Sequence, residues 1–324
     1  MFTKAFDLGK ILFFFEAEVW DHMHKKHSGM TLLECLFAIT LGAILLILIS
    51  KIYIGSKEIY KKQTGISELQ ENIHLAASIL TQNIRTAGFI GCPNLSTIQL
   101  EKHYLEHEQL PEYFSFENAI YGFDSKDAPD YLKNKIARGT CGIIVRKVEQ
   151  NTALLSENIV EPTSKINIIT NPSFEKDDVI VISDCDNIDV FKANGASDTS
   201  ISLAGSSKIK HNYNKKDSQI GKFTETAYFI SKSSRKDSNG NPIYGLYTAK
   251  NRESKEELLS NIINMQIKYG LDENKKRENT KYYFANEITK NGLWKSVRRV
   301  IIALTLSSHN NKTKEINFYI TLRE

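Results

Sequence analysis

The stretch that decides the fold is Ser28-Gly29-Met30-Thr31-Leu32-Leu33-Glu34-Cys35-Leu36-Phe37-Ala38-Ile39-Thr40-Leu41-Gly42-Ala43-Ile44-Leu45-Leu46-Ile47-Leu48-Ile49-Ser50. From Met30 to Ser50 the one charged residue is Glu34, and the other residues are apolar or small. A helix that crosses a bilayer needs about 20 apolar residues. Residues 30–50 are therefore expected to form a transmembrane helix.

Basic residues precede this stretch, and an acid lies within it. Residues 24–27 read His-Lys-Lys-His, and such a flank stays on the cytoplasmic side of the membrane. A carboxylate at membrane depth costs about 2.5–3.5 kcal/mol, so Glu34 is expected to have a function. The plainer alternative is a tolerated charge near the membrane interface.

Gly29-Met30-Thr31-Leu32-Leu33-Glu34 resembles the processing site of type IV pilins. That site has Gly, then an apolar residue, then Thr-Leu, another apolar residue and Glu. The resemblance implies that a prepilin peptidase removes residues 1–29 and methylates the new amine of Met30. The family usually has Phe at the Met30 position. Residues 1–22 fit no targeting class, so translation is expected to start at Met23. An ordinary signal anchor is the alternative interpretation.

Helical periodicity continues beyond the apolar stretch, over residues 51–88, which we expect to be amphipathic. The apolar stripe consists of Ile59, Ile66, Leu69, Ile73, Ala76, Leu80, Ile84 and Ala87, at the three- and four-residue spacings of one helix face. Gly55 and Gly65 are expected to bend or locally melt the helix. Gly88, followed by Pro93, is expected to end it.

Residues 89–324 are expected to form a β-rich head, which makes the chain an α+β protein. Residues 89–140 show no clear period, whereas short β-branched runs follow from Cys141. Phe223–Ser231 and Tyr244–Ala249 are expected to form a hairpin. A helix is expected over Glu256–Met265, and the final strands over Val297–Ser307 and Glu315–Leu322.

Several later segments are similar to the PilW family of minor pilins. They are Gln70–Asn72, Ile84–Cys92, Asp178–Cys185, Asp189–Phe191, Tyr244–Tyr247, Ile263–Gly270 and Trp294–Leu306. The resemblance implies a lollipop-shaped pilin whose long helix is first transmembrane and then packed on a globular head. It implies a structural, non-enzymatic subunit of the complex that primes, or tips, a type IV pilus.

The same resemblance implies the partners and the location of the chain. Its helix would pack with other minor pilins and the major pilin, and the prepilin peptidase would process it. It would cross the inner membrane once, with a periplasmic head, and reach the cell-surface pilus after assembly. Glu34 would pair with the terminal ammonium of a neighbouring pilin. The alternatives are a J-type minor pseudopilin of type II secretion and a membrane-tethered adhesin or DNA-binding pilin.

Other chemistry has little support in the sequence. The motifs of phosphate-binding loops, hydrolases and metalloproteases do not occur, so we expect no enzyme, cofactor or small-molecule substrate. His103 with His107, and the alternating residues Asp237, Asn239 and Asn241, are read as solvated side chains and a hairpin turn rather than metal sites. The basic residues Lys208, Lys210, His211, Lys215 and Lys216 are read as a solvated loop, so nucleic acid is not expected as a partner.

Four cysteines occur in the chain, namely Cys35, Cys92, Cys141 and Cys185. Cys35 lies in the apolar stretch and is expected to be unpaired. The other three lie where the compartment is oxidising, and an odd count leaves one thiol over. Because Cys92 and Cys185 lie in segments that resemble the PilW family, the resemblance favours a Cys92–Cys185 disulfide, with Cys92–Cys141 as the alternative.

Overall fold

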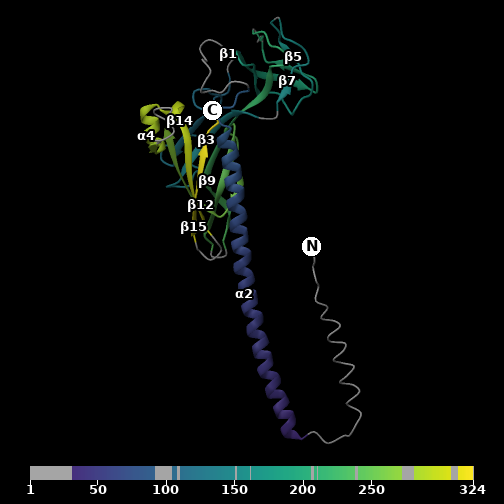
Figure 1. Cartoon of the computed structure of the whole chain (residues 1–324), viewed down its shortest axis with the longest axis vertical. Coiled ribbons are helices and arrows are strands. Elements are labelled where there is room, and N and C mark those ends of the chain that lie inside the picture. The colour runs from purple at the N-terminus through teal and green to yellow at the C-terminus, as the bar shows by residue number, and fades with distance from the viewer. Residues whose placement is uncertain are drawn as a thin grey trace. The chain divides into compact units, whose positions relative to one another are not determined.

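The computed structural model describes residues 31–91, 104–107, 110–149, 152–160, 162–205, 208–209, 211–237, 240–271, 281–307 and 313–323. For residues 104–107 it describes the backbone alone. The chain divides into two units, residues 1–64 and residues 65–324, and each is considered by itself. One long helix followed by a β-rich head makes the chain a mixed α+β protein, as expected (Figure 1).

Helix α2 runs from Leu32 to Arg85 without interruption. Proline, which would break a helix, does not occur between Met30 and Cys92. The predicted melting at Gly55 and Gly65 is wrong, because both glycines lie inside the continuous helix. The predicted end is confirmed: Gly88 adopts a φ of 79°, which glycine reaches without strain. The Gly88 N–H then donates to the Arg146 carbonyl at 2.8 Å.

The larger sheet has eleven strands within the described residues. Its main path runs β11-β10-β9-β6-β7-β8-β5, while β1 adds to β7, β4 adds to β9, and β2 pairs with β3, which in turn pairs with β9. Its strands are β1 (Tyr104–His107), β2 (Ile120–Asp124), β3 (Cys141–Val148), β4 (Ala153–Leu154), β5 (Lys165–Asn167), β6 (Val179–Ser183), β7 (Ile188–Ser197), β8 (Ser200–Leu203), β9 (Gln219–Lys236), β10 (Pro242–Lys250) and β11 (Glu256–Ser260).

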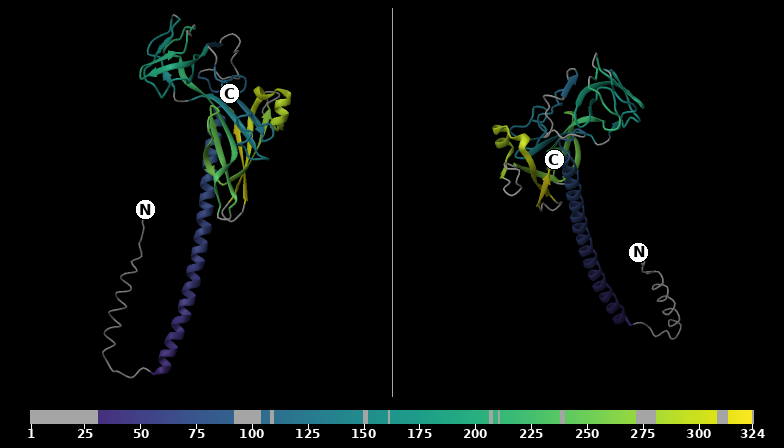
Figure 2. Two further views of the ribbon diagram at one scale, coloured as in Figure 1. Left: turned by 180° about the vertical axis from the view of Figure 1, so that it is seen from behind. Right: turned by 45° about the horizontal axis from the view of Figure 1, so that its top comes forward.

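Strand β9 connects the two ends of this sheet. Its first residues pair with β4 and β6, and its later residues pair with β3 and β10. The predicted hairpin is confirmed in β9 and β10, although both strands are longer than expected. In both views of Figure 2 the teal strands, which include β5 and β7, gather apart from the yellow strands near the C-terminus.

The smaller sheet has the order β13-β12-β14-β15. Its strands are β12 (Ile262–Leu271), β13 (Lys281–Tyr283), β14 (Val297–Ser307) and β15 (Thr313–Thr321), with helix α4 (Ala285–Asn291) and the 3-10 helix η1 (Trp294–Ser296) between β13 and β14. The helix predicted over residues 256–265 is wrong. Those residues form β11 and the start of β12, because they pair with β10 and β14. Asn261, with a φ of 63°, separates the two strands.

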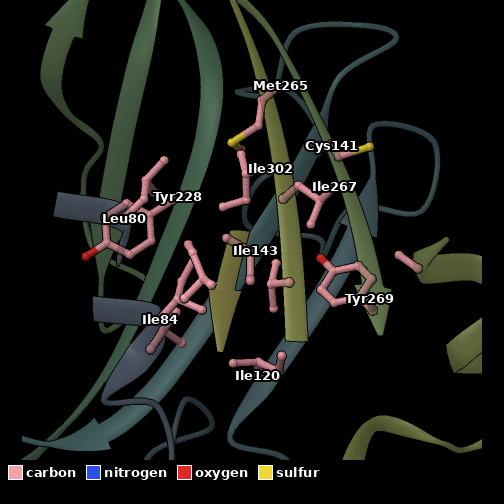
Figure 3. Close-up of a cluster of buried hydrophobic side chains, with 14 of the residues drawn as sticks. Leu80, Ile84, Ile120, Cys141, Ile143, Tyr228, Met265, Ile267, Tyr269 and Ile302 are labelled. Atoms are coloured by element: carbon pink, nitrogen blue, oxygen red, sulfur yellow. The ribbon is translucent and has the colours of Figure 1, made fainter. Parts of the chain in front are cut away.

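The largest core receives the C-terminal end of α2. Ala76, Leu80 and Ile84 are fully buried there, and Leu69 and Ile73 pack against the same cluster. Figure 3 shows Leu80 and Ile84 pointing from the helix toward side chains of β3, β9, β12 and β14. The predicted stripe is therefore confirmed from Leu69 onward. Its first members, Ile59 and Ile66, are exposed instead.

Candidate functional site

The predicted processing residues Gly29 and Met30 lie outside the described residues. Glu34 lies in the first turn of α2, where its N–H donates to the Thr31 carbonyl at 2.9 Å. The Glu34 side chain is exposed, and no described residue pairs with its carboxylate. The predicted role of Glu34 in assembly stays a prediction.

Around Glu34, α2 presents an apolar surface on every side. Within the described part of the chain, α2 is the helix that is long and apolar enough to cross a membrane, and the apolar window has none of its residues buried. Leucines and isoleucines from Leu32 to Ile54 are exposed all round the helix. A helix that is apolar on all faces is typical of a membrane span. This segment fits a membrane anchor.

The last turn of α2 and the residues after it form hydrogen bonds to the larger sheet. Lys147 of β3 donates from Nζ to Asn83 Oδ1 and to Thr86 Oγ1, both at 2.9 Å. Burial lowers the pKa of Lys147, because desolvation destabilises the charged form of its ammonium. The Val148 N–H donates to the Phe89 carbonyl at 2.7 Å. The helix end is therefore fixed against β3.

Residues 90 and 91 then reach the end of β6. Ser183 Oγ donates to the Ile90 carbonyl at 2.6 Å. Gly91 has a φ of 112°, and a Cβ built there would lie 2.0 Å from Ser183 Oγ. Only glycine allows so close an approach. Gly91, the residue before Cys92, thus lies against Ser183, and Ser183 is two positions before Cys185.

The described cysteines differ in their state. Cys35 and Cys141 have free thiols, whereas Cys185 is not free, and Cys92 lies outside the described residues. The Cys141 thiol donates to Asp124 Oδ1 at 3.1 Å, and burial raises its pKa to about 12. The alternative Cys92–Cys141 disulfide is therefore wrong, and the Cys92–Cys185 disulfide stays a prediction.

One cluster of buried charges was missed by the sequence analysis. Glu225 on β9 has a side chain that is 1% exposed, and Arg146 Nη2 approaches its Oε2 at 2.7 Å. Arg252 Nε approaches Glu225 Oε1 at 3.3 Å, and Tyr131 OH donates to the same oxygen at 3.4 Å. These residues line an open cavity of about 210 Å³. Pairing on both sides offsets the desolvation of the Glu225 carboxylate.

This cluster holds four segments of the head together. Residues 131, 146, 225 and 252 lie on separate elements, and no motif joins them in sequence. Burial, and next the Glu225 charge, raises the pKa of Tyr131 well above its usual value. Both carboxylate oxygens of Glu225 already have partners. The geometry is that of a structural ion pair rather than of an acid or base with a free position.

The predicted basic loop is not a continuous cationic patch in the described residues. Lys208, Lys215 and Lys216 are exposed, but the His211 Nδ1 lies 2.9 Å from Asp189 Oδ2. Asp189 is fully buried and also accepts a hydrogen bond from Tyr213 OH at 2.7 Å. His211 therefore takes part in the packing of the head.

Metal coordination has no support in the described part of the chain, where no three His, Cys, Asp or Glu side chains gather. Asp237 serves the hairpin between β9 and β10: its Oδ1 accepts from the Asn241 N–H at 2.7 Å, and its carbonyl accepts from the Gly240 N–H at 3.0 Å. The predicted hairpin turn is confirmed for Asp237 and Asn241, and Asn239 lies outside the described residues.

Comparisons with known protein families gave two matches. Residues 227–321 match the model of type IV pilus-assembly protein W, and residues 24–50 match the prokaryotic N-terminal methylation motif. Searches of curated proteins and of solved structures found no significant match. The two family matches confirm the resemblance to PilW-family pilins. They cover the membrane-type start of the chain and the strands from β9 to β15.

Proposed function

From the premise that this is a PilW-type, type IV pilus-related pilin, we propose that it is a minor pilin of the complex that primes or tips the pilus. In this function it is a structural subunit. A prepilin peptidase cuts after Gly29 and methylates Met30, α2 anchors the chain in the inner membrane, and the head stands in the periplasm. The complete molecule is then the lollipop of the pilin family.

The observation that carries this proposal is Glu34 in its surroundings. Glu34 is a single acid on an all-round apolar stretch of helix, and it lies within residues 24–50, which match the N-terminal methylation motif. In a low dielectric an unpaired carboxylate is costly, and a bonded partner charge offsets much of that cost. We assign that partner to the terminal ammonium of a neighbouring pilin. The pairing favours one axial register between packed helices.

The proposed disulfide fixes the head where the chain leaves the helix. Gly91 lies against Ser183, and Cys141 is free; both observations favour Cys92–Cys185. Closing such a loop stabilises a fold by about 4–5 kcal/mol in the chain-entropy model. Peptide mapping under non-reducing conditions tests the bond, and a Cys92 recovered with a free thiol would remove it from the proposal.

The main experiment separates assembly from folding through Glu34. Glu34→Gln keeps size and hydrogen bonding but removes the charge, so recovery of partner pilins and pilus number should fall at least tenfold, whereas thermal unfolding of the head should not change. Glu34→Asp should be intermediate because it keeps the charge and loses reach. The matched control is Glu58→Gln, an exposed acid on the same helix that pairs with Lys62 at 2.9 Å. Wild-type recovery with Glu34→Gln would contradict the pairing.

Processing is tested separately at Gly29. Gly29→Ala should block cleavage, so the intact mass of the membrane-extracted chain should include the leader. An unprocessed chain should still insert in the membrane, because residues 30–50 are unchanged. A wild-type chain whose mature form retains residues 24–29 would contradict assignment to the pilins.

A further inference from the structure

The part of α2 that follows the apolar stretch is strongly basic. Residues 51–67 contain four lysines, and Glu58 is the single acid among them. The basic residues 24–27 already account for the cytoplasmic side of the anchor, because positive charge is retained on that side. A second basic cluster at the opposite end of the apolar stretch is not explained by that rule, and its charge points to an anionic partner.

Two of these lysines share one face of the helix with two tyrosines. Tyr53, Lys57, Tyr60 and Lys61 lie at positions i, i+4, i+7 and i+8, which fall on the same side of an α-helix. We call these four residues the Tyr–Lys stripe. All four side chains are exposed, with Tyr53 at 67% and Tyr60 at 69%. The stripe is therefore open to a molecule other than this chain.

The two lysines of the stripe have no acid beside them. The acid of this segment is already engaged, since Glu58 Oε1 lies 2.9 Å from Lys62 Nζ. Within the described residues, no carboxylate pairs with Lys57 or Lys61. These two lysines are four residues apart, and like charges at that spacing destabilise a helix. An anion bound between them would remove this repulsion.

The position of the stripe identifies the anion as the phosphate of a lipid headgroup. Exposed apolar side chains extend to Ile54, and at 1.5 Å per residue Lys57 lies about 4.5 Å beyond it and Lys61 about 10.5 Å. The headgroup layer on each side of a bilayer is about 5–8 Å thick. Helical side chains lean toward the N-terminus, so both ammonium groups lean back toward this layer. Tyrosine also prefers this layer, because its ring is apolar and its hydroxyl is polar.

With the membrane anchoring proposed above as its premise, we propose that the Tyr–Lys stripe binds the headgroups of anionic phospholipids in the leaflet where α2 leaves the membrane. Lys57 and Lys61 contact the phosphate, while Tyr53 and Tyr60 pack beside the lipid at the same depth. A zwitterionic lipid has the same phosphate, but its own cation cancels the charge. The stripe therefore distinguishes lipids by net charge, and the bound lipid fixes the depth of the helix.

Lipid competition on the full chain tests the site. The chain is held in mixed micelles with equal phosphatidylglycerol and phosphatidylcholine, and native mass spectrometry measures the ratio of the two bound lipids. Each lysine near an anionic lipid should contribute about a fivefold preference, so the wild type should favour phosphatidylglycerol roughly 25-fold. Lys57→Gln should reduce the preference to about fivefold, and Lys57→Gln with Lys61→Gln should abolish it. The double arginine variant keeps both charges and should keep the preference.

Two control variants separate the stripe from the charge of the whole chain. Lys208→Gln with Lys216→Gln removes two exposed lysines of the head, so it changes the net charge as much as the double stripe variant does. Glu58→Gln with Lys62→Gln removes an ion pair of α2 and leaves the net charge unchanged. Neither control should alter the lipid ratio. Carbonate extraction and thermal unfolding check that every variant is inserted in the membrane and folded.

Three results would overturn the proposal. The first is an equal loss of preference in the head control, because the effect would then come from net charge alone. The second is a double stripe variant that keeps the preference, which would assign the lipid to another surface. The third is a double stripe variant that keeps its lipid but loses its partner pilins, which would assign the stripe to an acidic helix of a neighbouring subunit.

The lipid site and the pilin function can fail independently. Glu34→Gln should lose partner pilins and keep the lipid preference, because Glu34 lies at the other end of the apolar stretch. The double stripe variant should still be cut after Gly29. If the wild type showed no lipid preference while Glu34→Gln still lost its partners, the lipid site would be wrong and the pilin function would stand.

Discussion

The two halves of α2 have similar apolar residues and opposite environments. Leu45 in the first half is 59% exposed, whereas Leu80 in the second half is fully buried. The second half has a core of its own chain to enter, and it contributes to the stability of the head. Along the first half, the described leucines and isoleucines from Leu32 to Ile54 are exposed, as suits contact with a bilayer or with other helices. Under the proposed function, the second half of α2 serves folding of the head and the first half serves assembly.

The largest expected effect comes from shortening the buried leucine. Leu80→Ala removes a fully buried side chain and should lower the free energy of unfolding of the head by about 2–5 kcal/mol, measured by urea denaturation. The matched control is Leu45→Ala, which should leave that value unchanged. If Leu45→Ala destabilised the head as much, the separation between the halves would be wrong.

A smaller effect is expected at the end of the second half. Lys147→Met keeps the apolar stem but removes both hydrogen bonds to Asn83 and Thr86. Each such bond contributes about 0.5–1.5 kcal/mol, and relief of the buried charge offsets part of the loss. Urea denaturation should therefore show a loss of about 1 kcal/mol. An unchanged midpoint would mean that the helix end is held by packing alone.

The smallest effect is a pH dependence from Cys141, which lies in the core that receives the second half. Because burial raises its pKa from 9.0 to about 12, the neutral thiol stabilises the folded head. This contribution is fully present below pH 9 and is lost as the pH rises toward 12. At pH 9.5 the loss should be roughly 0.8 kcal/mol. Cys141→Ser, which does not titrate there, should show a shallower decrease between pH 8 and 10.

The sequence predicted the first half of α2 better than the second. Length and apolarity alone identify residues 30–50, whereas the stripe from Ile59 to Ala87 specifies only which residues share a face. A local pattern does not show which part of the stripe is buried, so it could not predict that Ile59 and Ile66 are exposed. Glu34 was identified because a single acid among apolar residues is a local feature.

Most of what the sequence missed depends on tertiary pairing. Residues 256–265 have helix-forming glutamates and leucines, but the strands beside them, β10 and β14, impose an extended form. The ion pairs around Glu225 join residues from 112 to 252, so only the fold brings them together. Helix α4 is short, and it follows Phe284, whose side chain cannot cap a helix; the Phe284 N–H donates to Glu287 Oε2 at 2.8 Å.

The way the chain leaves α2 also has a mechanical consequence. Three successive residues after the helix are bonded to strands: Gly88 to Arg146, Phe89 to Val148, and Ile90 to Ser183. Tension that reaches the C-terminal end of α2 is therefore divided between β3 and β6 before it reaches any loop. Several bonds must break together for the helix to be pulled away from the sheet. The hydrogen-bonded connection between the helix and the head is therefore suited to transmit force.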